Sequence, residues 1–276
     1  MAAPFDLTNL ATLKQYISPA TVTSTVADSI LQEIITGVSE GIQLYCSREF
    51  AVQIRTEVRN GNNRNSMRTL VYPIQSVASI VIAAINGQPG QTLTPNNYTN
   101  DNWFIYLQPG NAFGCRFSYG KQNITLNYTA GFITPGQLQL LSAPAWAAST
   151  LMTVGAQIQA AGQIYQVLVA GTTGLTIPAF VDTQNTIIAG DGSVTWWAVG
   201  PVPVLPSTAQ MLPYDLQLAC LQQSALVSKN RTRVGDTSTG VGPDRVSFFM
   251  RGMTDSTKEL LNRHREVFPT DGMGVV

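Results

Sequence analysis

The residue types that most often carry catalysis or bind metals are scarce in this sequence. Its single histidine, His264, has no accompanying nucleophile motif and lies at helical spacing from apolar residues, which favours a packed or interface histidine. The three cysteines, Cys46, Cys115 and Cys220, are far apart, so neither a His/Cys zinc site nor a disulfide framework is expected. The glycine-rich stretch 234–242 lacks the strand-to-helix context of a phosphate loop. We therefore expect no enzymatic activity, no metal and no cofactor.

Basic residues form two groupings that could contact an anionic partner. The first lies around the first expected pair of strands and contains Arg48, Arg55, Arg59, Arg64 and Arg68. The second lies around a polar loop at 234–245 and contains Lys229, Arg231, Arg233 and Arg245. In both groupings, acidic residues lie among the basic ones or successive basic residues point to opposite faces of their element. This favours a solvated surface or salt bridges between subunits, with contact to passing DNA as the alternative. The second grouping is a candidate channel or subunit-interface site.

The overall charge and hydropathy limit the partners further. Sixteen Lys and Arg balance sixteen Asp and Glu, so no global positive field draws the protein onto nucleic acid or an anionic membrane. This disfavours a sequence-specific DNA-binding protein. The longest apolar stretch, 77–85, is far shorter than the roughly 20 residues that a bilayer requires, and the first residues lack a signal-peptide pattern. We expect no membrane contact and synthesis in the cytosol.

Residues 142–201 differ in composition from the rest of the chain. They contain no Lys, Arg or Glu, yet they hold three of the four Trp. This shift predicts a module inserted into a host domain, with the host divided into residues 1–141 and 202–276. Because a strand end and a helix start can lie close together, we expect the host to keep its fold around the module.

Short alternating runs separated by Gly, Thr and Pro indicate that 142–201 is a small all-β, sandwich-like module. The order P-x-W, G-x-x-Y, G-T-T-G and D-G-x-V-x-W is similar to the small carbohydrate-binding-like β modules of bacteriophage structural proteins. Its aromatic side chains form either the core or a platform for sugar rings, and a module of about sixty residues favours the core. These aromatic residues are Trp146, Tyr165, Phe180, Trp196 and Trp197.

We expect the host to be a helical domain with β-hairpins. Apolar residues at helical spacing predict helices in 6–17, 23–50, 211–233 and 255–268. Asp6 or Thr8 is the expected N-terminal cap of the first helix. Ser256 and Glu259 have capping-box spacing at the start of the last helix.

Alternating apolar and polar residues predict strands between these helices, so the fold class is α+β. The first two strands, 51–59 and 66–74, flank the turn-forming residues Asn60 and Gly61 and are expected to pair as a hairpin. Further strands are expected at 76–84, 103–107, 123–132 and 246–250.

Four host segments carry a family resemblance: YCSREF (45–50), LVYPIQSV (70–77), NYTAGF (127–132) and LPYDLQLA (212–219). In this order, between helices at both ends, they resemble the head-to-tail adaptor (connector) proteins of tailed bacteriophages. The resemblance covers most of residues 7–267 apart from 142–201. That segment stands where the family runs directly from YTAGF into LPxDL.

The resemblance implies a non-enzymatic ring of about twelve subunits around a channel. Such a ring lies beneath the portal of a DNA-filled capsid, in the neck of the virion, after synthesis in the host bacterial cytoplasm. The implied partners are the portal protein, a neck or tail-completion protein, further copies of the chain, and passing genomic DNA in non-specific contact. The C-terminal segment of related adaptors commonly docks on the portal. The candidate portal-docking residues are an apolar stripe expected to be exposed on the last helix: Leu260, Leu261, His264, Val267 and Phe268.

A second function class stays open, namely a virion decoration or glycan-binding protein that acts through the inserted module. Adjacent aromatic rings can stack on the faces of sugars. The candidate platform would then consist of Trp146, Tyr165, Trp196 and Trp197.

Overall fold

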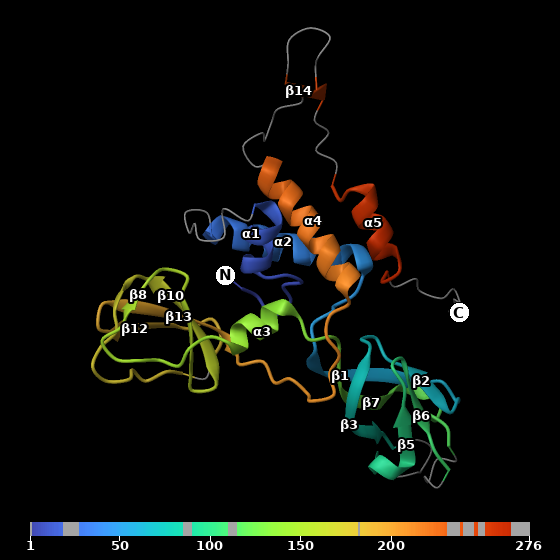
Figure 1. Ribbon diagram of the computed structural model, residues 1–276. Helices are drawn as coiled ribbons and strands as arrows, with labels where there is room; N and C mark the ends of the chain where they lie inside the picture. Colours follow the sequence, from blue (N-terminus) through green and yellow to red (C-terminus); the bar gives the residue numbers. More distant parts are fainter. Residues whose placement is uncertain are drawn as a thin grey trace. The chain divides into compact units, whose positions relative to one another are not determined.

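The structure is a computed structural model that describes residues 2–18, 28–84, 90–109, 115–181, 183–230, 238–239, 246–247 and 252–265. Helices and antiparallel sheets occur along the chain, which confirms the mixed α+β class (Figure 1). The chain divides into two compact units. The first unit contains Met1–Arg48, Pro135–Val202 and Leu212–Val276, and the second contains Glu49–Thr134 and Pro203–Met211.

The α-helices of the described residues belong to the first unit. They are α1 (Leu10–Ile17), α2 (Asp28–Cys46), α3 (Pro135–Leu141), α4 (Tyr214–Asn230) and α5 (Asp255–Asn262). Leu13, Leu31, Ile35 and Leu221 join α1, α2 and α4 in one buried cluster, as the helical spacing of apolar residues predicts. Within the described ranges, no helix has both the length and the apolar character needed to cross a membrane.

The second unit is built from two antiparallel sheets. The first sheet has the order β1 (Gln53–Gly61), β7 (Gly120–Ala130), β3 (Ile74–Ile82) and β4 (Gln91–Leu93). The second has the order β2 (Ser66–Arg68), β6 (Phe104–Leu107) and β5 (Tyr98–Asn100), preceded by the 3-10 helix η2 (Pro95–Asn97). Side chains from both sheets, among them Met67, Ile80, Ile105 and Leu126, share one core.

The predicted hairpin between 51–59 and 66–74 is wrong. Strand β1 pairs with β7, and β2 pairs with β6. Gly61 is needed for close approach rather than for a turn, because a Cβ there would lie 1.6 Å from the Ser118 carbonyl oxygen. Farther along β1, the buried Glu57 carboxyl accepts hydrogen bonds from the Tyr128 hydroxyl and from the Leu70 N–H, the latter at 2.9 Å. These contacts fix β1 against β7.

Residues 142–201 contain two further antiparallel sheets. The larger has the order β12 (Ile187–Asp191), β13 (Val194–Pro201), β10 (Gln163–Val169) and β9 (Gln157–Ala160), and the smaller pairs β8 (Leu151–Met152) with β11 (Gly171–Thr172). Alternate residues of β10 and β13 face a buried cluster that includes Tyr165, Val167, Val194, Trp196 and Ala198. This alternation is the period of two that the sequence displays.

Residues 142–201 are tied to the helices of the first unit. The Gln159 side-chain amide donates to the carbonyls of Leu140 and Leu141 at 3.1 and 2.9 Å, at the C-terminal end of α3. Ala2, Leu140 and Ile164 form a buried cluster, with Val199 and Val202 packed against it. Removal of 142–201 would therefore uncover Leu140 and leave the last carbonyls of α3 without these donors.

Two short strands are described near the C-terminal end of the chain. Strand β14 (Ser238–Thr239) pairs with β15 (Val246–Ser247). The rest of the predicted 234–245 loop and residues 248–250 of the predicted strand lie outside the described residues.

Candidate functional site

Three of the four segments that carry the resemblance converge on one backbone junction in the second unit. The N–H of Phe132 donates to the Phe50 carbonyl at 2.7 Å, and the N–H of Val52 donates to the Phe132 carbonyl at 2.8 Å. The N–H of Gly131 donates to the Pro73 carbonyl at 3.0 Å. The end of YCSREF, the middle of LVYPIQSV and the end of NYTAGF therefore meet at Gly131 and Phe132.

Residue Gln210, which precedes the fourth segment, is bonded next to the same place. The N–H of Ile133 donates to the Gln210 carbonyl at 2.8 Å, two residues before LPYDLQLA begins. Gly131 permits this crowding: its φ is +114°, and a Cβ would lie 2.5 Å from the Ala51 carbonyl oxygen. The Gln75 side-chain amide also donates to the Gly131 carbonyl at 2.8 Å. The first three segments thus meet at one junction, whereas the sequence showed only their order along the chain.

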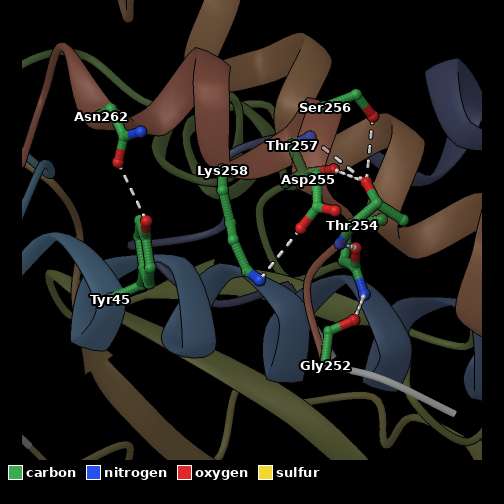
Figure 2. Close-up of polar contacts among 9 residues, drawn as sticks. Tyr45, Gly252, Thr254, Asp255, Ser256, Thr257, Lys258 and Asn262 are labelled. Atoms are coloured by element: carbon green, nitrogen blue, oxygen red, sulfur yellow. Dashed lines mark hydrogen bonds and ion pairs between the residues drawn. The ribbon is translucent and has the colours of Figure 1, made fainter.

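Helix α5, which carries candidate portal-docking residues, is fixed to α2 and α4. The Tyr45 hydroxyl of α2 donates to Asn262 Oδ1 at 2.9 Å (Figure 2). The Arg265 guanidinium lies 5.5 Å from the centroid of the same Tyr45 ring, within the range of a cation–π contact. On the α4 side, His264 Nε2 lies 2.7 Å from Asp215 Oδ2. Contacts from two helices therefore hold the end of α5.

The expected exposure of the α5 stripe is wrong where the structure describes it. Leu261 is fully buried, Leu260 is half-buried, and His264 pairs with α4. Val267 and Phe268 lie outside the described residues. The physical reason is that a helix of eight residues depends on tertiary packing for its stability, so α5 uses its apolar side for that packing.

The start of α5 also differs from the expectation. Thr254 rather than Ser256 is the N-cap, because the Thr254 hydroxyl accepts a hydrogen bond from the Thr257 N–H at 3.2 Å (Figure 2). Gln223 of α4 supports this turn, since its amide nitrogen lies 3.5 Å from the Gly252 carbonyl and its amide oxygen 3.4 Å from the Thr254 nitrogen.

Replacement of Leu261 by Ala should release α5 from α2 and α4. Truncation of a buried leucine costs about 2–5 kcal/mol, more than a helix of this length gains from its own hydrogen bonds. Hydrogen exchange of the backbone amides in 255–262 should become much faster, while exchange in α2 stays slow. The exposed Glu259→Ala variant is the control and should leave α5 protected. Wild-type protection in Leu261→Ala would contradict this account of α5.

The candidate channel residues are only partly described. Lys229 is exposed in the last turn of α4, and Arg231, Arg233 and Arg245 lie outside the described residues. The residues of the first basic grouping have different environments. Arg55 pairs with Glu49, Arg48 is buried, and the Arg68 guanidinium lies 5.7 Å from the centroid of the Trp103 ring. Tyr72 stacks on the same Trp103 ring at 3.9 Å.

A buried carboxyl group organises the aromatic residues of 142–201. Asp191 Oδ2 accepts hydrogen bonds from the indole nitrogens of both Trp146 and Trp196, each at 2.8 Å. Its Oδ1 accepts from the Gly174 N–H, also at 2.8 Å. The side chain of Asp191 thus accepts hydrogen bonds from residues in three separate segments. Sequence reasoning had treated it only as part of a turn.

The same residues are placed for packing rather than for a sugar platform. Tyr165 is fully buried, its hydroxyl donates to the Val181 carbonyl, and its ring centroid lies 4.4 Å from that of Phe180. Trp196 is also fully buried. Trp197 is half-buried and, as the next residue along β13, points to the opposite face of the sheet.

Sequence reasoning missed a second buried carboxyl group, that of Asp6. Asn9 caps α1 by accepting from the Thr12 N–H at 2.8 Å, so the expected cap at Asp6 or Thr8 is wrong. Asp6 Oδ2 instead accepts from the Ala3 N–H and the Gln32 amide, each at 2.8 Å. Burial raises the pKa of Asp6 to about 7, against the lowering effect of these hydrogen bonds. The polar Gln32 on the largely apolar buried side of α2 was the available signal.

Comparisons with known proteins give limited information. No family model and no curated protein matches the sequence. A solved structure of the neck of an empty GTA particle, computed with C6 symmetry, matches with 11% sequence identity and a TM-score of 0.45. The match covers 99% of this chain and 96% of that chain. A likeness at this level assigns neither a family nor a function to the chain.

Proposed function

We propose that this protein is a head-to-tail adaptor of a tailed bacteriophage. It is a structural, non-enzymatic subunit that forms a ring beneath the portal, joins the DNA-filled capsid to the neck or tail, and continues the DNA channel. Its place is the neck of the virion, after synthesis in the bacterial cytoplasm. Its partners are the portal protein, a neck or tail-completion protein and further copies of itself.

One observation carries this proposal. Three of the four sequence segments that resemble the adaptor family meet through backbone hydrogen bonds around Gly131 and Phe132, and the chain that leads into the fourth segment is bonded to the adjacent Ile133 through Gln210. A set of short motifs found by chance would have no reason to form one junction. The balance of acidic and basic residues agrees with the role, because a strongly basic channel would retain DNA.

Residue roles follow from this function. Lys229, with Arg231, Arg233 and Arg245, lies at the channel or at a subunit boundary. Portal docking falls to Val267 and Phe268, with Leu260 at its edge, because Leu261 and His264 are already engaged with α2 and α4.

Truncation at Glu266 tests the docking role. The shortened chain should keep its helical circular dichroism, fail to bind the portal protein, and yield DNA-filled heads without tails. A chain that ends after Thr270 retains Val267 and Phe268 and is the matched control, which should bind. The measurement is the mass of the protein in solution with and without its portal. Undiminished portal binding by the Glu266 truncation would place the docking surface elsewhere.

Virion decoration or glycan binding through 142–201 is the second candidate. Trp197 supports this candidate because its side chain is only half-buried, whereas Tyr165 and Trp196 are fully buried. Saturable binding of host polysaccharide that is lost in Trp197→Ala would favour this function over the adaptor.

A further inference from the structure

Helix α2 presents an exposed stripe that runs along its length. Ile30, Glu33, Gly37, Glu40 and Leu44 are exposed, at spacings of three and four residues that put them on one side of the helix. Ile30 and Leu44 are large apolar side chains with 47% and 70% of their surface exposed. A Cβ on Gly37 would meet no atom within 4 Å, so no described part of the chain covers the middle of the stripe.

The stripe is acidic and its charges are uncompensated. Helix α2 contains no Lys or Arg, and its other acidic residue, Asp28, pairs with Lys14 at 2.8 Å. Among the described residues, none makes an ion pair or hydrogen bond with the side chain of Glu33 or Glu40. Two unpaired carboxylates between two exposed apolar side chains suit a basic partner that also carries apolar surface.

The second unit carries a surface of that complementary kind around β2. Arg64 and Arg116 are exposed, and the Phe117 N–H donates to the Arg64 carbonyl at 2.8 Å, which brings the two arginines to neighbouring positions. Neither arginine side chain has an ion-pair partner in the part of the chain that the structure describes. Leu70 and Trp103 are exposed near the other end of β2, where the Thr69 N–H donates to the Trp103 carbonyl at 3.2 Å, and they are the apolar residues that we assign to this surface.

The nearby Asp101 side chain makes its hydrogen bonds within its own loop, and among the described residues it forms no ion pair with Arg64 or Arg116. Asp101 accepts hydrogen bonds from the N–H groups of Trp103 and Phe104, each at 2.7 Å, and from the Tyr106 hydroxyl at 2.8 Å. Its carboxyl is thus already engaged within its own loop. Trp, Tyr and Arg are also the residue types most enriched among the side chains that dominate binding at protein interfaces.

The two units differ in charge as wholes. The second unit holds six basic and three acidic residues, and the first holds ten basic and thirteen acidic ones. Their formal charges are therefore +3 and −3, although the chain as a whole is neutral. Opposite charges on different parts of one subunit favour contacts in which one part of a copy meets the other part of the next.

We infer that the α2 stripe of one copy binds the β2 surface of the next copy, head to tail. The inference rests on the proposed ring, because an interface between two different surfaces repeats from copy to copy and closes when the rotation permits. Glu33 and Glu40 face Arg64 and Arg116, Ile30 and Leu44 face Leu70 and Trp103, and Gly37 allows the backbones to approach closely.

Charge reversal on each side gives a direct test. The first variant carries Glu33→Arg and Glu40→Arg, and the second carries Arg64→Glu and Arg116→Glu. Each variant by itself presents like charges on both surfaces and should associate at least about 100-fold more weakly than the wild type. An equimolar mixture should associate again, because each surface of one variant is then complementary to a surface of the other. Native mass spectrometry reads the association, and circular dichroism verifies that each variant is folded.

A third variant fills the space in front of the α2 stripe without changing the charge. Gly37→Trp projects a large side chain from the exposed stripe, so the single subunit should fold and the association should fail. Wild-type association of either reversed variant, a mixture that stays monomeric, or a wild-type chain that is monomeric at all concentrations would overturn the inference. A neck location is tested separately, by labelling the protein in assembled particles, so failure of this interface and failure of the adaptor role are distinguishable.

Discussion

Replacement of Asp6 by Asn is expected to remove most of the pH dependence of stability that the wild type shows between pH 3.8 and about 7. In the unfolded chain this carboxyl loses its proton near pH 3.8, and in the folded protein near pH 7. Between these values the folded protein binds one more proton than the unfolded chain, so the free energy of unfolding falls as the pH rises. The total loss is about 4 kcal/mol.

Asn suits the site because it stays neutral at every pH. Its side-chain oxygen can accept from the Ala3 N–H and from the Gln32 amide, as Asp6 Oδ2 does. Above pH 7 the variant should therefore be more stable than the wild type, by up to about 4 kcal/mol. Below pH 3.8 the two proteins should differ little.

Denaturant titrations at a series of pH values, followed by circular dichroism, measure this effect, because the α-helices of the described residues belong to the first unit. The matched control is Asp255→Asn, an exposed acid in the same unit that pairs with Lys258 at 3.3 Å. It should leave the pH profile of the wild type unchanged. A wild-type profile in Asp6→Asn would mean that Asp6 is not the group responsible.

Replacement of Asp191 by Ala should unfold residues 142–201 while the helices remain. The variant loses the acceptor of two indole N–H groups and of the Gly174 N–H. Buried donors without partners cost about 1–3 kcal/mol each, so the sum is comparable to the entire stability of so small a module. Three of the four Trp lie in this segment, so Trp fluorescence reports its unfolding directly.

Ser193→Ala is the matched control for Asp191, because it removes the acceptor of one exposed hydrogen bond, from the Thr172 N–H at 2.9 Å. It should shift the unfolding midpoint only slightly. Asp191→Asn keeps one acceptor oxygen and should fall between the two. An Asp191→Ala protein with the fluorescence and midpoint of the wild type would refute the role assigned to this carboxyl.

Four of the helices and some of the strands could be predicted because their signals are local, whereas helix α3 and short strands such as β4 and β5 were missed. Apolar residues at helical spacing located α1, α2, α4 and α5 to within several residues, and alternation located β3, β6 and β7. Strand pairing failed because it is not local. Asn60 and Gly61 have the composition of a hairpin turn, whereas the partner of Gly61 is Gly120, far along the chain.

The candidate site was predictable only in part, for a related reason. The four segments with the resemblance could be read from the sequence, but the convergence of the first three depends on backbone hydrogen bonds, which the residue types do not encode. Gly131 is the exception, since its φ and the nearby Ala51 carbonyl exclude other residues. The residue types and spacing of Leu261 and His264 are compatible both with exposure to solvent and with packing against another helix. The sequence pattern therefore could not decide their exposure.

The shared burial of Ala2, Leu140 and Ile164 has a consequence for the order of events on the ribosome. Ala2 is synthesised long before Leu140 and Ile164, which share its buried cluster. Contacts between such distant residues form slowly, because a long loop must close first. Ala2 is therefore expected to stay accessible on the nascent chain until residues 140–164 have emerged, so its packing is completed late.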